Sequence, residues 1–304
     1  MKPNRLKAML LAGEPAYGPV CTQGSVDSVE IAAHAGFDFV FVDGQHGGFN
    51  RESIREAARA VQTTQTTPLA RVSASCDAGQ IEYLLDSGYP ALTFPMVNTA
   101  RQAQRLVDAA YYPPLGHRSI GNCRATLYFG DDYYDKFNAE LLLMVIIESV
   151  QAVQNIDEIM SIDGISGCQI GTSDLSASLG LPRTKLGGTD SKELDDAIAR
   201  VCDATVAAGK IPGIYVNTPQ QAQARVAQGF RYIVITYEFG IIADAWRNTI
   251  AQLPEHPRGG QFFKWTVVAG KTKATANVAH AIARLARPRG WRWNRALCQV
   301  LTEG

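Results

Sequence analysis

The sequence predicts an α/β fold, a (β/α)8 TIM barrel, and three observations support this prediction. Short apolar runs and helical patterns alternate eight times over about 250 residues, which is the size and rhythm of such a barrel. The run at 141–147 is apolar throughout, as expected of a strand buried on both faces of a parallel sheet. No GxGxxG motif follows any run, which argues against the alternative of a doubly wound open sheet.

The expected strands are apolar runs that end where polar residues begin. The second of them, FDFVFV, leads directly into the polar segment DGQHGG, and the fifth and sixth are followed by Glu148 and by the stretch around Asp174. In chain order we expect strands at 17–22, 37–42, 68–72, 91–97, 141–147, 167–171, 212–216 and 232–237.

The expected helices follow these strands and several end at glycines. Gly36 and Gly88 suit the residue just beyond a helix, because glycine adopts the left-handed conformation found there. The stretch at 150–160 places its apolar residues on one helical face. We expect helices at 26–35, 51–62, 78–87, 99–109, 150–160, 191–208, 219–228 and 241–253, with a short helix after Asp174.

Composition bounds the domain organisation and the class of partner. We predict a barrel domain over 1–254 and a C-terminal extension over 255–304 that contains Trp265, Trp291 and Trp293. The extension has nine Lys/Arg and two Glu, a net charge of +7, whereas the whole chain is neutral, so we expect neither a nucleic-acid nor a membrane partner. We interpret the extension as an additional helix packed on the barrel or on a neighbouring subunit.

The cysteines and the apolar runs indicate a cytoplasmic protein. Six cysteines lie far apart with no CxxC pair, which argues against a zinc ribbon and against a dithiol redox motif. Reduced thiols are the default in the cytoplasm. The apolar run near the N-terminus, at 9–12, is shorter than a signal-peptide core, and no run has the length of a membrane span.

Two carboxylates stand where buried strands end. Glu148 follows the 141–147 run and Asp174 lies just past the 167–171 run. Ser173 or Asp174 is expected to cap the short helix that follows, so that the amides of 171–173 face a bound anion. The alternative is that Asp174 is only a cap and Glu148 only a polar strand terminus.

In a barrel the C-terminal strand ends form one rim, so Asp43, His46, Arg71, Glu148 and Asp174 should converge. Two carboxylates without histidine or thiolate ligands favour Mg2+ or Mn2+ over zinc. Other divalent cations also fit such a site. Arg71 suits a developing negative charge, and His46, three residues after Asp43, suits an acid or base. No lysine lies at the predicted rim, so a Schiff-base mechanism is disfavoured.

Five ordered motifs resemble those of the HpcH/HpaI aldolases, metal-dependent class II pyruvate aldolases with a barrel of the phosphoenolpyruvate/pyruvate superfamily. The resemblance runs from about Asn4 to Leu253. The motifs are FDFVFVDGQHG at 37–47, PLARV at 68–72, FPMVNTARQAQRLVDAAYYPPLGHRSIG at 94–121, IIES at 146–149 and IGTSDLSASLG at 170–180.

The resemblance implies a role for each residue that matches a motif. It implies that Glu148 and Asp174 ligate the cation, that Arg71 contacts the pyruvyl oxygen and that His46 with Asp43 forms the acid/base pair. The substrate-binding residues that it implies besides Arg71 are Gly171, Thr172, Ser173 and Gln45. The family usually has glutamate where this chain has Gln45, so a negative charge near the base is missing.

The predicted function is divalent-metal-dependent carbon–carbon lyase activity, cleaving or forming 4-hydroxy-2-oxo acids through a pyruvate enolate. The alternative is oxaloacetate decarboxylation followed by addition of the same enolate to another acceptor, as in macrophomate synthase. A third possibility is a catalytically silent barrel that acts as a scaffold. The expected partners are a 2-oxo acid and an aldehyde. The resemblance also implies further copies of the chain as partners, in a hexamer or another multimer of dimers that exchange a C-terminal barrel helix. We expect the segment from Tyr111 to Tyr134 to select the aldehyde.

Overall fold

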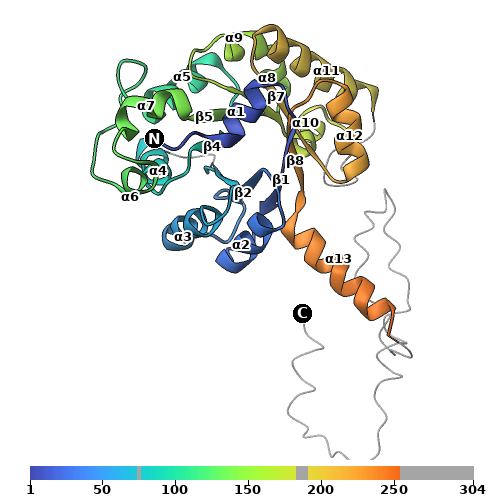
Figure 1. Cartoon of the computed structure of the whole chain (residues 1–304). Helices are drawn as coiled ribbons and strands as arrows, with labels where there is room; N and C mark the ends of the chain where they lie inside the picture. The colour runs from blue at the N-terminus through green and yellow to red at the C-terminus, as the bar shows by residue number, and fades with distance from the viewer. Residues whose placement is uncertain (74–76, 183–190, 254–304) are drawn as a thin grey trace, which may run out of the picture. The chain divides into compact units, whose positions relative to one another are not determined.

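Eight parallel strands close into a barrel in which each strand pairs with the next in the sequence and β8 pairs with β1 (Figure 1). The computed structural model describes residues 1–73, 77–182 and 191–253. The barrel prediction is therefore confirmed. The strands are β1 (Ala16–Cys21), β2 (Phe39–Asp43), β3 (Thr67–Arg71), β4 (Ala91–Phe94), β5 (Leu142–Ile147), β6 (Gly167–Ile170), β7 (Ile211–Val216) and β8 (Tyr232–Tyr237).

Helices connect the strands and surround the barrel (Figure 1). Those that agree with the sequence prediction are α2 (Val26–His34), α3 (Arg51–Val61), α4 (Ala78–Asp86), α5 (Ala100–Ala110), α10 (Thr172–Ser178), α11 (Lys192–Ala207), α12 (Pro219–Ala227) and α13 (Glu238–Ala251). Most begin at a capping side chain. Ser25, Asn50, Asp77, Thr99, Ser191 and Thr218 each accept a hydrogen bond from a backbone amide in the first turn.

Alternation along the strands divides the buried residues between two cores. One core lies inside the barrel and includes Phe39, Phe41, Leu69 and Met144. The larger core lies between the barrel and its helices and includes the neighbouring residues of the same strands, such as Val40. The β5 strand is buried along its whole length, which explains its continuous apolar sequence.

The sequence did not predict the helix before β1. This helix, α1 (Arg5–Leu11), places Leu6 and Leu10 against the interior core of the barrel. Asn4 caps the helix and also donates hydrogen bonds to the carbonyls of Pro90 and Glu140. Because both carbonyls precede strands, α1 closes the N-terminal end of the barrel, opposite the predicted rim.

Two other stretches differ from their predicted structure. The expected single helix at 150–160 is divided into α8 (Val150–Gln154) and α9 (Ile156–Met160), because Asn155 leaves the helical conformation. The long polar segment after α5 contains α6 (Arg124–Phe129) and α7 (Tyr133–Glu140). These helices are too short to show a sustained hydrophobic periodicity in the sequence, and packing against the rest of the protein stabilises them.

Arg118 anchors the segment between α5 and α6. Its guanidinium is buried, lies 2.5 Å from Asp86, and stacks 4.6 Å from the Tyr112 ring and 4.5 Å from the Phe137 ring. A buried arginine held by one carboxylate and aromatic faces fixes its segment in place. The first part of this segment therefore has a defined structural role, while its predicted role in aldehyde selection stays a prediction.

The last described helix, α13, has little cover from the rest of its chain. Its chief packing partners are β1 and β8, and Glu238 is its one buried residue within the described part of the chain. Phe239, Ile241 and Trp246 are 64%, 49% and 70% exposed. The predicted extension at 255–304 and its tryptophans lie outside the described residues. No helix among those described has the length and hydrophobicity needed to cross a membrane.

Candidate active site

Asp43 and Arg71 form a buried ion pair across the ends of β2 and β3. The two residues are directly opposite in the strand register, and Arg71 donates from Nε at 2.9 Å and from Nη2 at 2.5 Å. Burial alone would raise the pKa of Asp43, but Arg71 and two backbone amides outweigh it, so the pKa is lower than usual. The aspartate is therefore ionised, and it fixes the guanidinium in one orientation.

The loop after β2 is organised by the same carboxylate. Asp43 Oδ1 accepts hydrogen bonds from the amides of Gln45 at 2.9 Å and His46 at 3.2 Å. The His46 side chain is exposed, and within the described chain no hydrogen bond joins its imidazole to Asp43. The structure thus connects Asp43 to His46 through the backbone, and the acid/base pairing of their side chains stays a prediction.

Glu148 is a buried carboxylate at the C-terminal end of β5. It is 6% exposed, and its Oε1 accepts a 2.6 Å hydrogen bond from the Met96 amide. Burial raises the pKa of Glu148 to about 7, and the nearby charge of Asp174 acts in the same direction. The Met96 hydrogen bond and Arg71 oppose that rise. A neighbouring cation would favour the ionised form of this carboxyl.

Asp174 lies in the first turn of α10, and the prediction that it or Ser173 caps the helix was wrong. Gly171 is the N-cap residue, so Ser173 and Asp174 are already helical. The aspartate is exposed, and its charge acts on Glu148. The structure therefore brings the two predicted ligands into one electrostatic environment and removes the cap-only explanation for Asp174.

Gly171 allows the close approach of Glu148 to α10. A Cβ atom at this position would lie 2.7 Å from Glu148 Oε2 and 2.9 Å from Glu148 Cβ, closer than atoms can pack. The Gly171 amide donates to the Ile147 carbonyl at 3.1 Å, so it is engaged within the barrel. Thr172 and Ser173, in the first turn of α10, carry the other two amides that were predicted to face an anion.

Thr172, already predicted to bind substrate, also brings a side-chain hydroxyl to the site. Its side chain is 3% exposed, and its Oγ1 is buried without a hydrogen-bond partner among the described residues. Buried hydroxyls are usually hydrogen-bonded. A bound substrate carboxylate next to the start of α10 would supply the missing partner.

The donor set at the rim fits a hard divalent cation. Within the described ranges there is no group of three or more His, Cys, Asp or Glu residues that could surround a metal ion. A cation held by Glu148 and Asp174 would therefore take its remaining ligands from water or substrate, as Mg2+ commonly does. The raised pKa of Glu148 is consistent with a carboxylate that binds a cation.

Two residues near these groups have an unusual backbone. Met96 and Thr236 are the non-glycine residues with positive φ in the described chain, each at 58°. The Met96 conformation accompanies the amide hydrogen bond to Glu148, and Thr236 precedes Tyr237, on whose phenol the charges of Arg71 and Glu148 act. Sequence reasoning missed Met96 and Tyr237 because residue type does not signal the positive φ of Met96 or that of Thr236, the residue before Tyr237.

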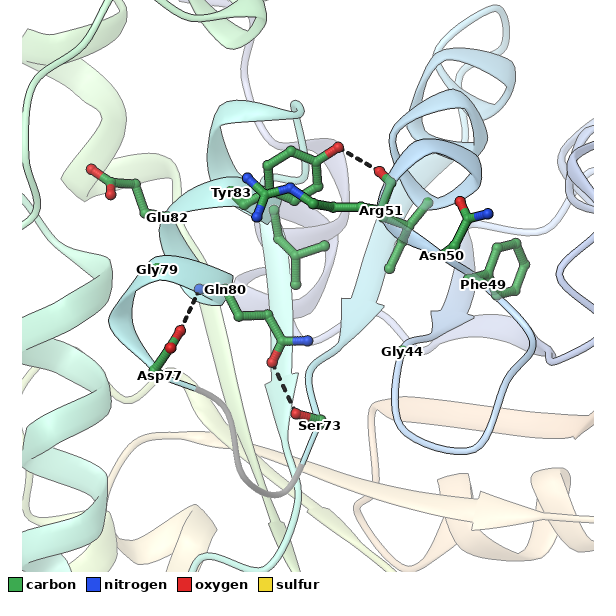
Figure 2. A pocket seen from close by; sticks show the side chains of 12 residues that line it. Gly44, Phe49, Asn50, Arg51, Ser73, Asp77, Gly79, Gln80, Glu82 and Tyr83 are labelled. Atoms are coloured by element: carbon green, nitrogen blue, oxygen red, sulfur yellow. Dashed lines mark hydrogen bonds between the residues drawn. The ribbon is translucent and has the colours of Figure 1, made fainter.

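A cavity of about 620 Å³ lies between α3 and α4, beside the rim (Figure 2). Gly44 and Ser73, which follow the ends of β2 and β3, line it, together with Arg51, Asp77 and Tyr83. Neither Glu148 nor Asp174 borders this cavity. It is therefore distinct from the part of the rim that holds the two predicted metal ligands.

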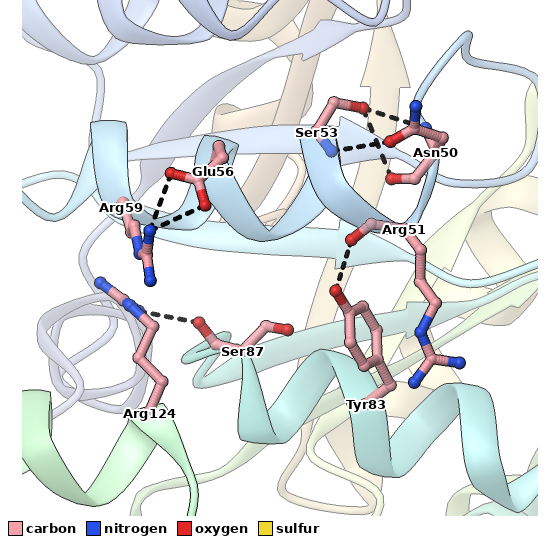
Figure 3. A network of polar contacts seen from close by, with 8 residues as sticks. All are labelled: Asn50, Arg51, Ser53, Glu56, Arg59, Tyr83, Ser87 and Arg124. Atoms are coloured by element: carbon pink, nitrogen blue, oxygen red, sulfur yellow. Dashed lines mark hydrogen bonds and ion pairs between the residues drawn. The ribbon is translucent and has the colours of Figure 1, made fainter.

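Polar contacts hold the two helices on either side of this cavity (Figure 3). The Tyr83 hydroxyl donates to the Arg51 carbonyl, and the Arg51 guanidinium lies 3.9 Å from the Tyr83 ring. A capping box between Asn50 and Ser53 begins α3. The loop that carries His46 leads directly into α3, which forms one wall of the cavity.

The closed barrel and its rim can now be compared with known proteins. A family model described as HpcH/HpaI aldolase/citrate lyase matches residues 23–245. The chain belongs to this family. The relationship expected from the five motifs is therefore confirmed.

Two relatives of similar sequence are named as aldolases. A hydroxypyruvate/pyruvate aldolase from Agrobacterium fabrum is 33% identical over 84% of this chain and 94% of its own length. A 4-hydroxy-2-oxo-heptane-1,7-dioate aldolase from Shigella sonnei is 33% identical over 80% of this chain and 92% of its own. The crystal structure of an HpcH/HpaI family protein from Burkholderia cenocepacia matches with a TM-score of 0.76 and 29% identity, covering 82% of this chain and 98% of the other.

Membership of the HpcH/HpaI family makes this protein an enzyme of the aldolase type, a carbon–carbon lyase. Enzymes of this family generally depend on a divalent metal.

Proposed function

We propose that this HpcH/HpaI family member cleaves and forms 4-hydroxy-2-oxo acids, with pyruvate and an aldehyde as the cleavage products. The observation that carries the proposal is the pairing of two unlike sites on one rim. One site is Glu148, whose pKa is raised by burial and by the charge of the neighbouring Asp174. The other site is the Asp43–Arg71 ion pair. The first suits a cation and the second suits a developing oxyanion.

Glu148 and Asp174 would hold the cation, Mg2+ or Mn2+. When bound, such a cation withdraws electrons from the 2-oxo group and stabilises the enolate of pyruvate. Thr172 and Ser173 would receive the substrate carboxylate at the start of α10, where the amides and the unpartnered Thr172 hydroxyl lie.

Arg71 would stabilise the negative charge on the oxygen at C2. Its Nε and Nη2 are held by Asp43, and Nη1 makes no hydrogen bond within the described chain. A guanidinium fixed in this way needs little reorganisation when charge develops nearby. Asp43 thus positions Arg71 and, through two backbone amides, the loop that carries His46 and Gln45.

His46 would act as the general base that takes the proton of the C4 hydroxyl. Its side chain is exposed on a loop whose backbone is tied to the rim, so the imidazole can reach a substrate bound there. Oxaloacetate decarboxylation is the alternative reaction of the same site, since it uses the same enolate but requires no prior proton transfer.

The decisive experiment measures pyruvate release from a panel of 4-hydroxy-2-oxo acids and from oxaloacetate. Activity should vanish with EDTA and return with Mg2+ or Mn2+, and borohydride with pyruvate should trap no adduct. A borohydride-trapped lysine adduct would refute the metal-dependent mechanism. Exclusive activity on oxaloacetate would favour the decarboxylase alternative.

We also propose that the protein is a homo-oligomer built from dimers that exchange α13. The support is the exposure of Phe239, Ile241 and Trp246 on a helix that should cover the barrel next to β8 and β1. Phe239 and Trp246 are seven residues apart and so share one face of α13, and large exposed apolar groups of this kind mark an interaction surface. Light scattering should show a multimer for the intact chain and a smaller species for Trp246→Asp. Deletion from Glu255 onward should leave Mn2+ binding intact.

A further inference from the structure

The C-terminal end of β8 departs from the regular alternation of a strand. Tyr232 and Val234 belong to the core inside the barrel, whereas Ile233 belongs to the core between the barrel and its helices. Continued alternation would direct Thr236 inward and Tyr237 outward.

A β-bulge at this point reverses that alternation. Gly18 pairs with Val234 and Val20 pairs with Tyr237, so β8 advances three residues while β1 advances two. Thr236 lies within the additional length and has a φ of 58°. A bulge beside an active site commonly redirects a side chain, and a β-branched residue at positive φ is strained. Such strain persists mainly where function requires it.

The bulge brings the Tyr237 ring inward over the mouth of the barrel. This ring packs against the interior core, with its centroid 5.0 Å from that of Tyr215. The charges of Arg71, Asp43, Asp174 and Glu148 all act on its phenol. The side chain thus lies within the electrostatic field of both halves of the proposed active site.

The hydroxyl groups of the two neighbouring tyrosines differ in their partners. The Tyr215 hydroxyl donates to Asn217 Oδ1 at 2.9 Å. The Tyr237 hydroxyl makes no hydrogen bond with the described residues, and the Tyr237 side chain is half-buried, with its hydroxyl absent from the fully buried polar atoms that lack a partner. It is therefore available as a donor to a bound molecule.

We infer that Tyr237 is a catalytic residue for carbon–carbon bond cleavage, donating a hydrogen bond from its hydroxyl to the substrate oxygen at C4. The inference rests on the proposed function and extends it to a residue from β8. Glu148 and Asp174 follow β5 and β6, and the His46 loop follows β2. The β8 strand lies on the arc of the rim between β6 and β2, so Tyr237 can reach the end of the substrate remote from the carboxylates.

The chemistry of cleavage gives this donor a specific task. The C3–C4 bond breaks, the C4 hydroxyl proton passes to His46, and the C3–C4 electron pair becomes the enolate of pyruvate. Negative charge develops on the C4 oxygen as it becomes the aldehyde carbonyl, and a preorganised hydrogen-bond donor stabilises that charge. Burial raises the pKa of Tyr237, so the phenol stays protonated at neutral pH and can serve as the donor.

The test compares Tyr237→Phe with Tyr215→Phe, a matched control that removes a hydroxyl already paired with Asn217. Three reactions are measured for each protein with Mg2+ or Mn2+ bound. They are cleavage of a 4-hydroxy-2-oxo acid, decarboxylation of oxaloacetate, and exchange of the pyruvate methyl protons with deuterated water. Only the first involves a C4 oxygen. Mn2+ binding and circular dichroism verify that each variant is folded.

Tyr237→Phe should lower kcat/KM for cleavage by about 10-fold or more, as expected when one donor to a developing charge is lost. Decarboxylation and proton exchange should change by less than about 2-fold, and Tyr215→Phe should leave all three near the wild-type rates. Equal losses in all three reactions, or no loss in cleavage, would overturn the role of Tyr237 in an active enzyme. A wild-type protein with none of the three activities would instead overturn the proposed function.

Discussion

The β2–β3 edge and the β5–β6 edge of the rim solve the problem of buried charge in opposite ways. At β2–β3, Asp43 meets Arg71 in a two-point contact that lowers the aspartate pKa. At β5–β6, Glu148 lies near a second carboxylate, and its pKa is raised to about 7. At β2–β3 the chain itself supplies the opposite charge, in Arg71. At β5–β6 a bound cation would supply it, and the ionised form of Glu148 would then be favoured.

This difference shows which part of the rim positions groups and which part binds. A satisfied ion pair holds its members in place and can guide neighbouring amides, as Asp43 does for Gln45 and His46. A buried carboxylate that makes no ion pair with the described residues gains most from a bound cation, because the cation offsets a desolvation penalty already present in the folded protein. Substitutions at the two edges should therefore have different consequences.

The largest effect is expected at the binding edge. Glu148→Ala or Asp174→Ala should abolish aldol cleavage and oxaloacetate decarboxylation together, because both reactions share the electron sink that the cation supplies. The measurement is kcat/KM for each reaction, with Mn2+ binding measured in parallel. Activity that persists in a variant without bound metal would refute the assignment of these carboxylates.

Breaking the positioning edge should chiefly reduce stability. Asp43→Ala leaves the buried Arg71 guanidinium without its partner, and we expect a loss of about 3–5 kcal/mol in the free energy of unfolding. Denaturant unfolding measures this loss. Glu56→Ala is the matched control, because Glu56 pairs with Arg59 on the surface, and its loss should be below about 1 kcal/mol. Similar losses in both variants would contradict the contrast.

His46 separates the two reactions that share the site. His46→Ala should lower aldol cleavage by about 10²-fold or more, the usual effect of losing a general base. Oxaloacetate decarboxylation should fall far less, since CO2 departs without prior proton abstraction. The measurement is kcat/KM for each of the two reactions in the variant and in the wild type, with each loss expressed as a free-energy difference. Equal losses in a folded, metal-bound variant would assign His46 to binding, and the base would have to be sought elsewhere.

The raised pKa of Glu148 predicts a pH-dependent stability in the metal-free protein. The folded state retains the proton up to about pH 7, whereas the unfolded state loses it near the ordinary value of 4.5. Stability should therefore fall as pH rises through this window, by on the order of 2 kcal/mol between pH 5 and 8. Glu148→Gln should lack this part of the pH dependence. If the free energy of unfolding had the same pH dependence in both proteins, the pKa of Glu148 would not be raised in the folded state.

The smallest effect concerns the strained backbone beside Tyr237. Thr236→Gly should raise the free energy of unfolding by about 1 kcal/mol, because glycine adopts a φ of 58° without strain. The same substitution at Thr67, within the regular strand β3, should lower it. Thermal and denaturant unfolding measure both changes. Destabilisation by Thr236→Gly would mean that contacts of the threonine side chain outweigh the strain.

Much of the fold and part of the site could be predicted from the sequence. Strands such as 141–147 are recognisable because both faces are buried, and parallel strands in a barrel bring their C-terminal ends to one rim. That reasoning placed Asp43, Arg71 and Glu148 at strand ends without knowledge of their contacts. It failed for α1, α6 and α7, whose short lengths give no sustained periodicity.

The barrel, the order of its strands and the charged residues that reach the rim follow from residue type and periodicity, so they could be predicted before the structure was known. The pairing of Asp43 with Arg71, the position of Gly171 as the N-cap residue of α10 and the inward direction of Tyr237 became known only from the three-dimensional structure. Each of these depends on the register between strands or on one local backbone conformation. A β-bulge that inserts one residue reverses the direction in which the following side chain points. The pattern of residue types in the sequence does not reveal such a bulge.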